Sequence, residues 1–403
     1  MKNNNKLIIV ILIAAVIIDI MGMGLVLPLM PSLFLTEHSV FVTGNPSVHY
    51  LYYAIAMGVW PLGLFFGTPF LGDLSDRFGR RNILILCLLG TALTYLASGI
   101  SSQCHWLSLF LISRFLSGFF AGSYVLAQAV MVDISPAELR SRYLGWISMA
   151  ASIGFVIGPV ITSVTGGSHF FSWLSLETPF YIAAILSVIN LASVALFLPE
   201  TDSHPRAVKL SLLSALTLFS HIFVDKRTRI LGFSFLFMQV GWGFYVQDIP
   251  LILNQVFHLD VKYLGLFFAV LGCGVLSGVL FVQPVALKYI SLRSLIIWTM
   301  IATCVILMAS VVFQVVSVQW LSAYLATIPE LVGYTASLTL LSKAVGDDEQ
   351  GKIMGGTGAV YGASWAINAL LIGGLSNFGP YVPLVIGCLC YLICAGFMWK
   401  VKK

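Results

Sequence analysis

The chain has 403 residues, of which 59% are hydrophobic and only 9% are charged. A soluble domain is about half apolar and about a quarter charged, so this composition excludes an ordinary soluble protein. The apolar residues form long blocks of about 20 residues or more, the length that spans a bilayer as a helix. A closed β-barrel would need alternating polarity, which these blocks lack. The sequence therefore predicts an all-α polytopic membrane protein.

Twelve apolar blocks are long enough to be transmembrane helices. They cover residues 7–31, 48–71, 82–101, 106–131, 143–165, 177–198, 229–253, 262–287, 293–314, 317–342, 352–375 and 380–399. The first block is too long for the apolar region of a signal peptide, lacks an A-x-A cleavage site and contains Asp19. We therefore expect it to be a transmembrane helix and not a cleaved leader.

Basic residues are distributed unevenly between the two ends of these blocks. Of the 21 lysines and arginines, Arg114 lies within a block, Lys262 lies at one surface, and the others fall on the opposite surface. The positive-inside rule then places both termini in the cytoplasm. The pI near 8.8 therefore reflects membrane topology and not a nucleic-acid partner. The seven cysteines lie mostly within the blocks, so we expect buried thiols with neither a disulfide framework nor a metal site.

The first and second halves of the chain resemble each other. "DIMGMGLVLPLMP" (19–31) aligns with "MQVGWGFYVQDIP" (238–250) at an offset of 219, and the glycines and the final proline match. Later, "RYLGWISM" (142–149) aligns with "KIMGGTGA" (352–359) at an offset of 210. The order and spacing of the two matches predict two parallel six-helix repeats, an arrangement that places a substrate site near the midplane between them.

The repeats define a domain division. We expect an N-terminal six-helix bundle at residues 1–198, a cytoplasmic linker at 199–228 and a C-terminal six-helix bundle at 229–403. Residues 210–223 of the linker are apolar enough to lie on the membrane face or against the bundle.

One short stretch between two apolar blocks, "GDLSDRFGRR" (72–81), is half charged. It matches the motif G-x-L-x-D-R-x-G-R-[RK] that joins helices 2 and 3 in the major facilitator superfamily. Other matches to that superfamily's drug:proton antiporters follow in the expected helices. They are Asp19, Gly22, Gly24, Pro28 and Pro31 in helix 1, Arg114, Gly118 and Gly122 in helix 4, Gly154, Gly158 and Pro159 in helix 5, and "LPET" (198–201) at the end of helix 6.

The whole chain thus resembles the twelve-helix drug:proton antiporters of the major facilitator superfamily, and most closely the tetracycline-efflux-like branch. The resemblance implies a major facilitator fold, a bacterial inner membrane and export coupled to protons. That branch also has an acidic residue in helix 9, whereas residues 293–314 contain none. This chain therefore departs from the pattern at a position associated with tetracycline transport.

Three ionisable residues within the spans are candidates for proton coupling: Asp19, Arg114 and Glu330. A carboxylate in the hydrocarbon region costs at least about 2.5–3.5 kcal/mol, so Asp19 faces a cavity, is paired or is protonated. Arginine stays charged in such a setting, so Arg114 would act electrostatically, and the family motif assigns it to proton coupling. Glu330 would be the site in the second half. Structural roles remain open for all three residues, with Glu330 hydrogen-bonded near Pro329 as one of them.

Polar and aromatic residues of helix 7 predict part of a substrate cavity, because pockets for amphiphilic ligands are mostly apolar with a few placed polar groups. The predicted cavity residues are Gln128, Gln239, Trp242, Tyr245 and Asn368. Helix packing, with Tyr245 in an interfacial aromatic belt, is the alternative. We expect Asp248, near the outer end of helix 7, to be an extracellular gate residue or a hydrated side chain. In helix 5, Gly154, Gly158 and Pro159 would pack closely against a second-half helix and seal the cavity.

The charged loop between helices 2 and 3 predicts a cytoplasmic gate. Asp76 would lie at the N-terminal end of helix 11, where free N–H groups and the helix dipole favour a carboxylate. Arg77 and Arg80 would bridge to Asp133, and these contacts would hold the halves together in the outward-open state. The full gate set is Gly72, Asp73, Asp76, Arg77, Gly79, Arg80, Asp133 and Arg140.

The leading functional prediction is a proton-coupled exporter of small amphiphilic compounds that works by alternating access as a monomer in the lipid bilayer. One alternative is a transporter of a defined anionic metabolite or siderophore, which would explain Arg114. Another is a lipid-handling or regulatory membrane protein that transports no soluble compound. No catalytic constellation stands out, and no Walker loop indicates ATP as an energy source, so we expect neither enzyme activity nor a cofactor.

Overall fold

The computed structural model describes residues 2–36, 39–42, 45–135, 139–166, 174–200, 211–346 and 349–401, and within them all regular secondary structure is helical. In the first half the helices are α1 (Lys2–Val26), η1 (Leu27–Leu29), α2 (Met30–Phe34), α3 (Pro46–Phe78), α4 (Arg80–Gln103), α5 (Leu107–Phe120), α6 (Ser123–Ile134), α7 (Arg140–Thr165) and α8 (Thr178–Phe197). Beyond it lie α9 (Ser214–Val224), α10 (Arg229–Gln255), α11 (Val261–Ser277), η3 (Gly278–Val282), α12 (Gln283–Tyr289), α13 (Leu292–Val312), α14 (Val316–Lys343), α15 (Gln350–Leu375), η4 (Ser376–Phe378) and α16 (Val382–Lys400).

Eleven helical segments among the described residues are long and apolar enough to cross a membrane. The remaining predicted span corresponds to α14, which has 28 residues but includes Gln319, Pro329 and Glu330 and is less apolar. Each of the twelve predicted spans therefore corresponds to a long helical segment, and the predicted all-α membrane fold is confirmed.

Two predicted spans are not continuous α-helices. Residues 106–131 were expected to be one helix, but the segment divides at Ala121 and Gly122 into α5 and α6. The segment after α11 is π-helical over Gly278–Val282 and returns to α-helix just before Pro284. A proline lacks the N–H of a regular helical turn, which explains the local change in hydrogen bonding there.

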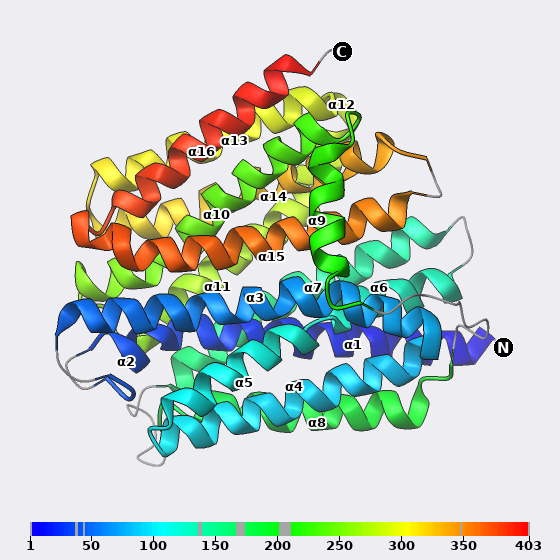
Figure 1. Ribbon diagram of the computed structural model, residues 1–403, viewed down its shortest axis with the longest axis horizontal. Helices are drawn as coiled ribbons and strands as arrows, with labels where there is room; N and C mark the ends of the chain where they lie inside the picture. Colours follow the sequence, from blue (N-terminus) through cyan, green and yellow to red (C-terminus); the bar gives the residue numbers. More distant parts are fainter. Residues whose placement is uncertain are drawn as a thin grey trace.

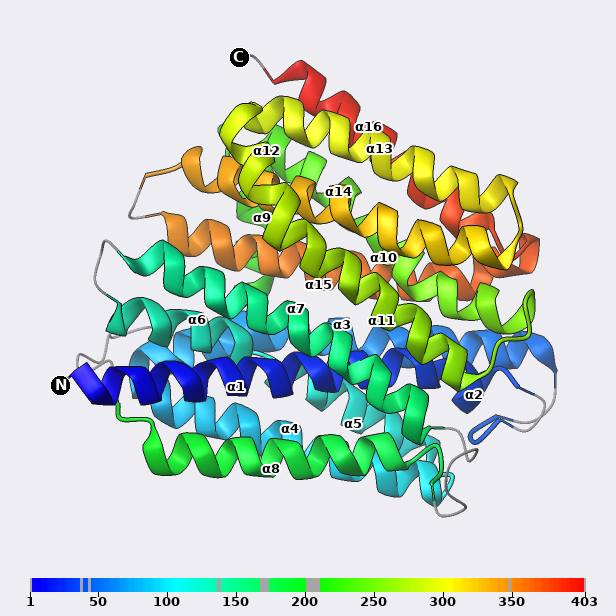
Figure 2. The same ribbon diagram turned by 180° about the vertical axis from the view of Figure 1, so that it is seen from behind.

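The helices form two groups that lie side by side (Figures 1 and 2). The first group comprises α1 to α8 and the second α10 to α16. They meet where α3 packs on α15 and α7 packs on α11. We call the side that carries Phe78, the start of α1 and the end of α16 the terminal side. The opposite side, which carries the loop at 104–106, is the far side.

Equivalent contacts in the two groups confirm the internal repeat. At the α1–α7 contact, a Cβ on Gly158 would lie 2.3 Å from the carbonyl oxygen of Met21. At the α10–α15 contact, Nδ2 of Asn368 donates a hydrogen bond of 3.0 Å to the carbonyl oxygen of Val240. Offsets of 210 and 219 relate these two pairs, so the same backbone carbonyl is approached by a glycine in one repeat and by an amide in the other.

The two groups contact each other tightly on the far side. A Cβ on Gly58 of α3 would lie 3.2 Å from Ala369 of α15, and one on Gly373 would lie 2.9 Å from Ala54. Towards the terminal side of the same pair of helices, nothing lies within 4 Å of the Cβ position of Gly72. The structure is therefore closed on the far side, and the two groups separate towards the terminal side.

The described hydrogen bonds between the two groups lie on the far side as well. Tyr50 donates to Oε1 of Gln255, and the Tyr53 hydroxyl donates to the carbonyl oxygen of Gln247 at 2.8 Å. Oγ of Ser163 donates to the carbonyl oxygen of Lys262 at 2.8 Å.

The linker helix α9 crosses the terminal side and packs against α15, α10 and α3 (Figure 1). Ile222 is fully buried, and its side chain fills the space beside Gly232 and Gly356. The apolar part of the linker was expected either on the membrane face or against the bundle, and the structure shows α9 against the bundle. Residues 201–210 of the linker lie outside the described residues.

Candidate functional site

Asp19 lies within α1, and the break in helix 4 determines its surroundings. Ser123 is the first residue of α6, and its hydroxyl donates to Oδ2 of Asp19 at 2.5 Å. The side chain is partly buried, and Ser123 is the hydrogen-bond donor that the structure gives to it. A carboxylate with so little compensation inside a helical bundle gains from taking up a proton. The geometry therefore suits a reversible proton-binding site.

Tyr95 links the two predicted proton-coupling residues of the first half. Its phenol interacts electrostatically with both Asp19 and Arg114. A Cβ on Gly22 would lie 2.3 Å from the Tyr95 hydroxyl, so the glycine of the helix 1 motif makes room for this ring. Arg114 is 6% exposed, and its Nε has no hydrogen-bond partner. Our sequence interpretation missed Tyr95, although a tyrosine inside an apolar span was the available signal.

Glu330 is 4% exposed and lies within α14. The Tyr391 side chain lies beside it, and Oε2 of Glu330 has no other hydrogen-bonding neighbour among the described residues. The second group thus holds a buried, poorly compensated acid, as the first group does at Asp19. The proposed contact of Glu330 with a carbonyl near Pro329 is not among the described hydrogen bonds.

The five predicted cavity residues occupy two kinds of environment. Gln128 and Trp242 are partly exposed, and Nε2 of Gln128 donates to the Tyr124 hydroxyl at 3.1 Å. Gln239, Tyr245 and Asn368 are buried, and each retains a polar atom without a partner. The first two residues are therefore partly exposed in this state, whereas the other three pack between helices.

Further partly exposed aromatic side chains lie near these residues. Tyr334 of α14 lies near Tyr124 of α6, and Tyr361 of α15 lies near Tyr334. The Tyr361 ring stacks on Trp365 at a centroid distance of 4.9 Å. Tyrosines from both groups thus lie near one another, and each presents an apolar ring and a hydroxyl.

The loop between α3 and α4 depends on Gly79 and Glu200. Gly79 has φ +96°, a conformation that glycine adopts without strain. The carboxylate of Glu200, just after α8, accepts hydrogen bonds from the backbone N–H of Arg80 at 2.9 Å and of Arg81 at 3.2 Å. It thereby caps the N-terminus of α4, where the helix dipole favours an anion. From the sequence, the "LPET" stretch was identifiable only as a helix end, and the capping role of Glu200 was not.

The charged residues of the predicted gate form contacts within the first group. Arg80 pairs with Asp76 at 2.8 Å, lies 3.5 Å from Asp133 and donates to Ser75 at 2.8 Å. Arg77 is exposed, with its guanidinium 5.3 Å from the centre of the Phe78 ring. The two remaining residues of the set are Asp73, which is partly exposed, and Arg140, whose side chain lies outside the described residues.

The prediction that the helix 5 glycines pack on a second-half helix is wrong. Gly154 and Gly158 face α1, where a Cβ would lie 2.5 Å from the carbonyl oxygen of Ile17 and 2.3 Å from that of Met21. Residues four apart share one helix face, and this face belongs to the first group. The contact with α11 uses another face, where the Pro159 carbonyl oxygen would lie 2.5 Å from a Cβ on Gly265.

The expectation that Asp248 could be hydrated is also wrong. Its relative exposure is 0%, and neither carboxylate oxygen has a hydrogen-bond partner. The residue lies near the far-side end of α10, where α3 packs against the second group and excludes water.

The fold and these buried ionisable residues define a polytopic α-helical transporter. The Major Facilitator Superfamily model matches residues 12–367, so the chain belongs to that family. It is 26% identical to the class C tetracycline resistance protein of Escherichia coli over 98% of this chain and 96% of that one. It is 31% identical to multidrug resistance protein 2 of Bacillus subtilis (strain 168), over 50% of this chain and 46% of the relative.

Solved structures share the fold. The human organic anion transporter MFSD10 (TETRAN) matches with a TM-score of 0.73 at 18% identity, over 98% of this chain and 99% of that one. A D-xylose-proton symporter matches with a TM-score of 0.76 at 15% identity, over 98% of both chains. The family match and the curated relatives confirm the predicted superfamily and a transporter in place of an enzyme, and the solved structures confirm the fold.

Proposed function

We propose that the protein exports small amphiphilic compounds in exchange for protons. The observation that carries this proposal is the Asp19 carboxylate, which lies inside the bundle with a single described hydroxyl donor. Similarity to tetracycline and multidrug resistance proteins along the chain supports export of drug-like compounds. The partly exposed tyrosines between the two groups suit flat, weakly polar molecules.

The mechanism would be alternating access. The terminal side is the cytoplasmic side by the distribution of basic residues, with both termini in the cytoplasm of a bacterium. The structure then represents the state that is closed towards the outside and takes substrate from the cytoplasm. Proton binding at Asp19 favours one of the two states, and this requires a different proton affinity in each. We propose that the monomer carries out the whole cycle.

A panel of amphiphilic cations, neutral drugs and polycarboxylates tests the substrate class. Inside-out vesicles with an acidic interior should accumulate lipophilic compounds, and accumulation should stop when the pH gradient is abolished. Selective accumulation of polycarboxylates would instead support the anionic-metabolite alternative. Among the described residues, the buried Arg114 is the observation in favour of that alternative.

We propose Glu330 as the second-half site for a proton or a substrate cation. The Glu330→Gln variant should lower gradient-driven accumulation of cationic compounds by about tenfold or more, and neutral compounds less, because a buried negative charge is lost. The measurement is the initial rate for each compound across a pH series. Glu177→Gln, which removes an acid outside the spans, is the control. Unchanged rates for every compound would refute the assignment.

We propose that the charged residues at the end of α3 and the start of α4 form the cytoplasmic gate. When the cytoplasmic side closes, Asp76 would reach the N-terminus of α15, where free N–H groups stabilise a carboxylate. The open position beside Gly72, on the same helix, leaves room for this approach. In the present state Asp76 pairs with Arg80 instead.

Asp76→Asn should therefore shift the population towards the cytoplasm-open state, because the closed state loses the carboxylate at a helix N-terminus, whereas Arg80 in the open state keeps Asp133 as a partner. Spin-label distances across the cytoplasmic side should lengthen on average. Arg77→Gln, which changes an exposed charge at the same end of α3, is a matched comparison. Identical distance distributions in wild type and Asp76→Asn would rule out the gate as described.

A further inference from the structure

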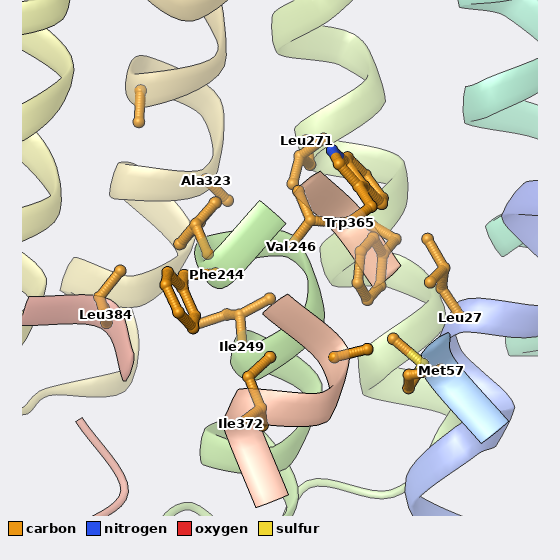
Figure 3. Packing of buried hydrophobic residues seen from close by; sticks show 14 of the residues in the cluster. Leu27, Met57, Phe244, Val246, Ile249, Leu271, Ala323, Trp365, Ile372 and Leu384 are labelled. Atoms are coloured by element: carbon orange, nitrogen blue, oxygen red, sulfur yellow. The ribbon is translucent and has the colours of Figure 1, made fainter. Parts of the chain in front are cut away.

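Asp248 is a buried acid for which the transport scheme above has no use. Neither carboxylate oxygen has a hydrogen-bond partner in the part of the chain that the structure describes, and the side chain is 0% exposed. Its neighbours in sequence, Val246 and Ile249, belong to the main apolar cluster. Figure 3 shows this cluster, with Leu27 and Met57 of the first group beside residues of α10 and α15. The acid therefore lies at the apolar seal that closes the far side.

Among the described residues, no polar group near Asp248 donates a hydrogen bond to its carboxylate. Tyr53 of α3 and Tyr381, just before α16, are the titratable groups that interact with it electrostatically. The Tyr53 hydroxyl already donates to the carbonyl oxygen of Gln247. Trp365 of α15 approaches α10 through its carbonyl oxygen, which accepts from Nε2 of Gln247 at 3.1 Å.

Charged and titratable groups on the other elements that pack on α10 are engaged elsewhere. Glu330 of α14 and Tyr391 of α16 lie beside each other. Lys262 of α11 lies over the Tyr263 ring at 5.8 Å. The short helices η1 and α2 carry no ionisable side chain. No described cation is therefore paired with Asp248, and its environment is uncharged.

An ionised carboxylate in such a site costs several kcal/mol, because neither a counter-charge nor water replaces the lost hydration. A neutral carboxylic acid avoids most of this cost. The closed far side seen here is therefore compatible with the protonated acid. If the far side opens, water reaches the same group and the ionised form becomes favourable.

We propose that Asp248 is a proton-binding site of the outer gate and that the far side closes only when this acid is protonated. A proton from the far side binds one carboxylate oxygen and removes the charge. The seal between α3 and the second group can then form, with Tyr53 donating to the carbonyl oxygen of Gln247. The inference rests on the alternating-access scheme proposed above, but it concerns gate closure and not the coupling at Asp19.

The test is the pH dependence of the far-side distance in purified protein in lipid nanodiscs without substrate. Spin labels at Val48→Cys and Tyr263→Cys report on the far side, after the exposed Cys104 and Cys273 are changed to serine. Labels at Leu139→Cys and Tyr289→Cys report on the terminal side. In the wild type, the ratio of far-side-open to far-side-closed molecules should rise with pH, by up to about tenfold per pH unit for a single proton.

Asp248→Asn imitates the protonated acid and should keep the far side closed across the pH range. Asp248→Leu, which is neutral and apolar, should do the same and covers the case in which the asparagine variant folds poorly. Asp260→Asn, a matched change at the far-side end of α11, should retain the wild-type response. Equal pH responses in wild type and Asp248→Asn, or a wild-type distance that does not depend on pH, would overturn the proposal.

The result separates this inference from the proposed function. A pH-dependent far side that is lost in Asp248→Asn stands even if no compound is exported against a pH gradient. Conversely, gradient-driven export that depends on Asp19, with a far side insensitive to Asp248, would leave the transport proposal intact and reject the outer-gate site.

Discussion

Asp19→Asn should abolish accumulation driven by a pH gradient while the protein still folds. Asparagine keeps the shape of the side chain and can still accept a hydrogen bond from Ser123, but it cannot bind and release a proton. Without a site whose proton affinity differs between the two states, the gradient no longer biases the cycle. Transport into inside-out vesicles, with the amount of folded protein measured in parallel, checks this prediction.

Ser123→Ala is the matched control for this experiment. It removes the hydroxyl that donates to Asp19 but leaves the carboxylate, so gradient-driven transport should persist at a reduced rate. Energy-independent exchange of substrate should survive in Asp19→Asn, because the cavity is unchanged. Full gradient-driven transport by Asp19→Asn would exclude Asp19 as the coupling site and leave its role as purely structural.

Gly158→Ala should destabilise the protein strongly. The added Cβ would lie 2.3 Å from the carbonyl oxygen of Met21 and 3.0 Å from the backbone N of Leu25. These are backbone atoms of α1, so α1 and α7 must move apart, and overpacking of this kind typically costs about 1–3 kcal/mol. The shift would also displace Asp19. This residue lies on α1 close to Met21, and it accepts a hydrogen bond from Ser123 at the break in helix 4. We expect a lower melting temperature in detergent together with reduced transport.

Gly145→Ala, on the same helix, provides the comparison. Nothing lies within 4 Å of its Cβ position, and alanine favours helix by up to about 1 kcal/mol over glycine. Its melting temperature should therefore equal or exceed that of the wild type. Equal melting temperatures for Gly158→Ala and wild type would show that the α1–α7 contact can relax without cost.

The fold could be predicted from the sequence because the bilayer imposes a simple rule. Every span must satisfy its own backbone hydrogen bonds, so long apolar blocks become helices and their order follows the chain. The repeat was also visible, since the matched glycines occupy positions where helices approach closely. The break after Phe120 could not be predicted, because Gly122 alone does not distinguish a continuous helix from an interrupted one.

The candidate site was only partly predictable. Asp19, Arg114 and Glu330 stand out because an ionisable residue in a span is costly, and this cost is independent of fold details. The direction in which a residue points depends on helix packing. For that reason Gly158 was placed against the wrong helix and the burial of Asp248 was missed. The capping role of Glu200 was not predictable either, because Glu200 is more than a hundred positions from the residues it caps.

The most direct test of proton-coupled export is the movement of protons when substrate is added. Purified protein in liposomes with an imposed pH gradient and a trapped pH-sensitive dye should dissipate the gradient on addition of a transported amphiphile, and protons should move opposite to the compound. Asp19→Asn liposomes should hold their gradient under the same conditions. Accumulation of the compound by the wild type with no proton movement would contradict the account.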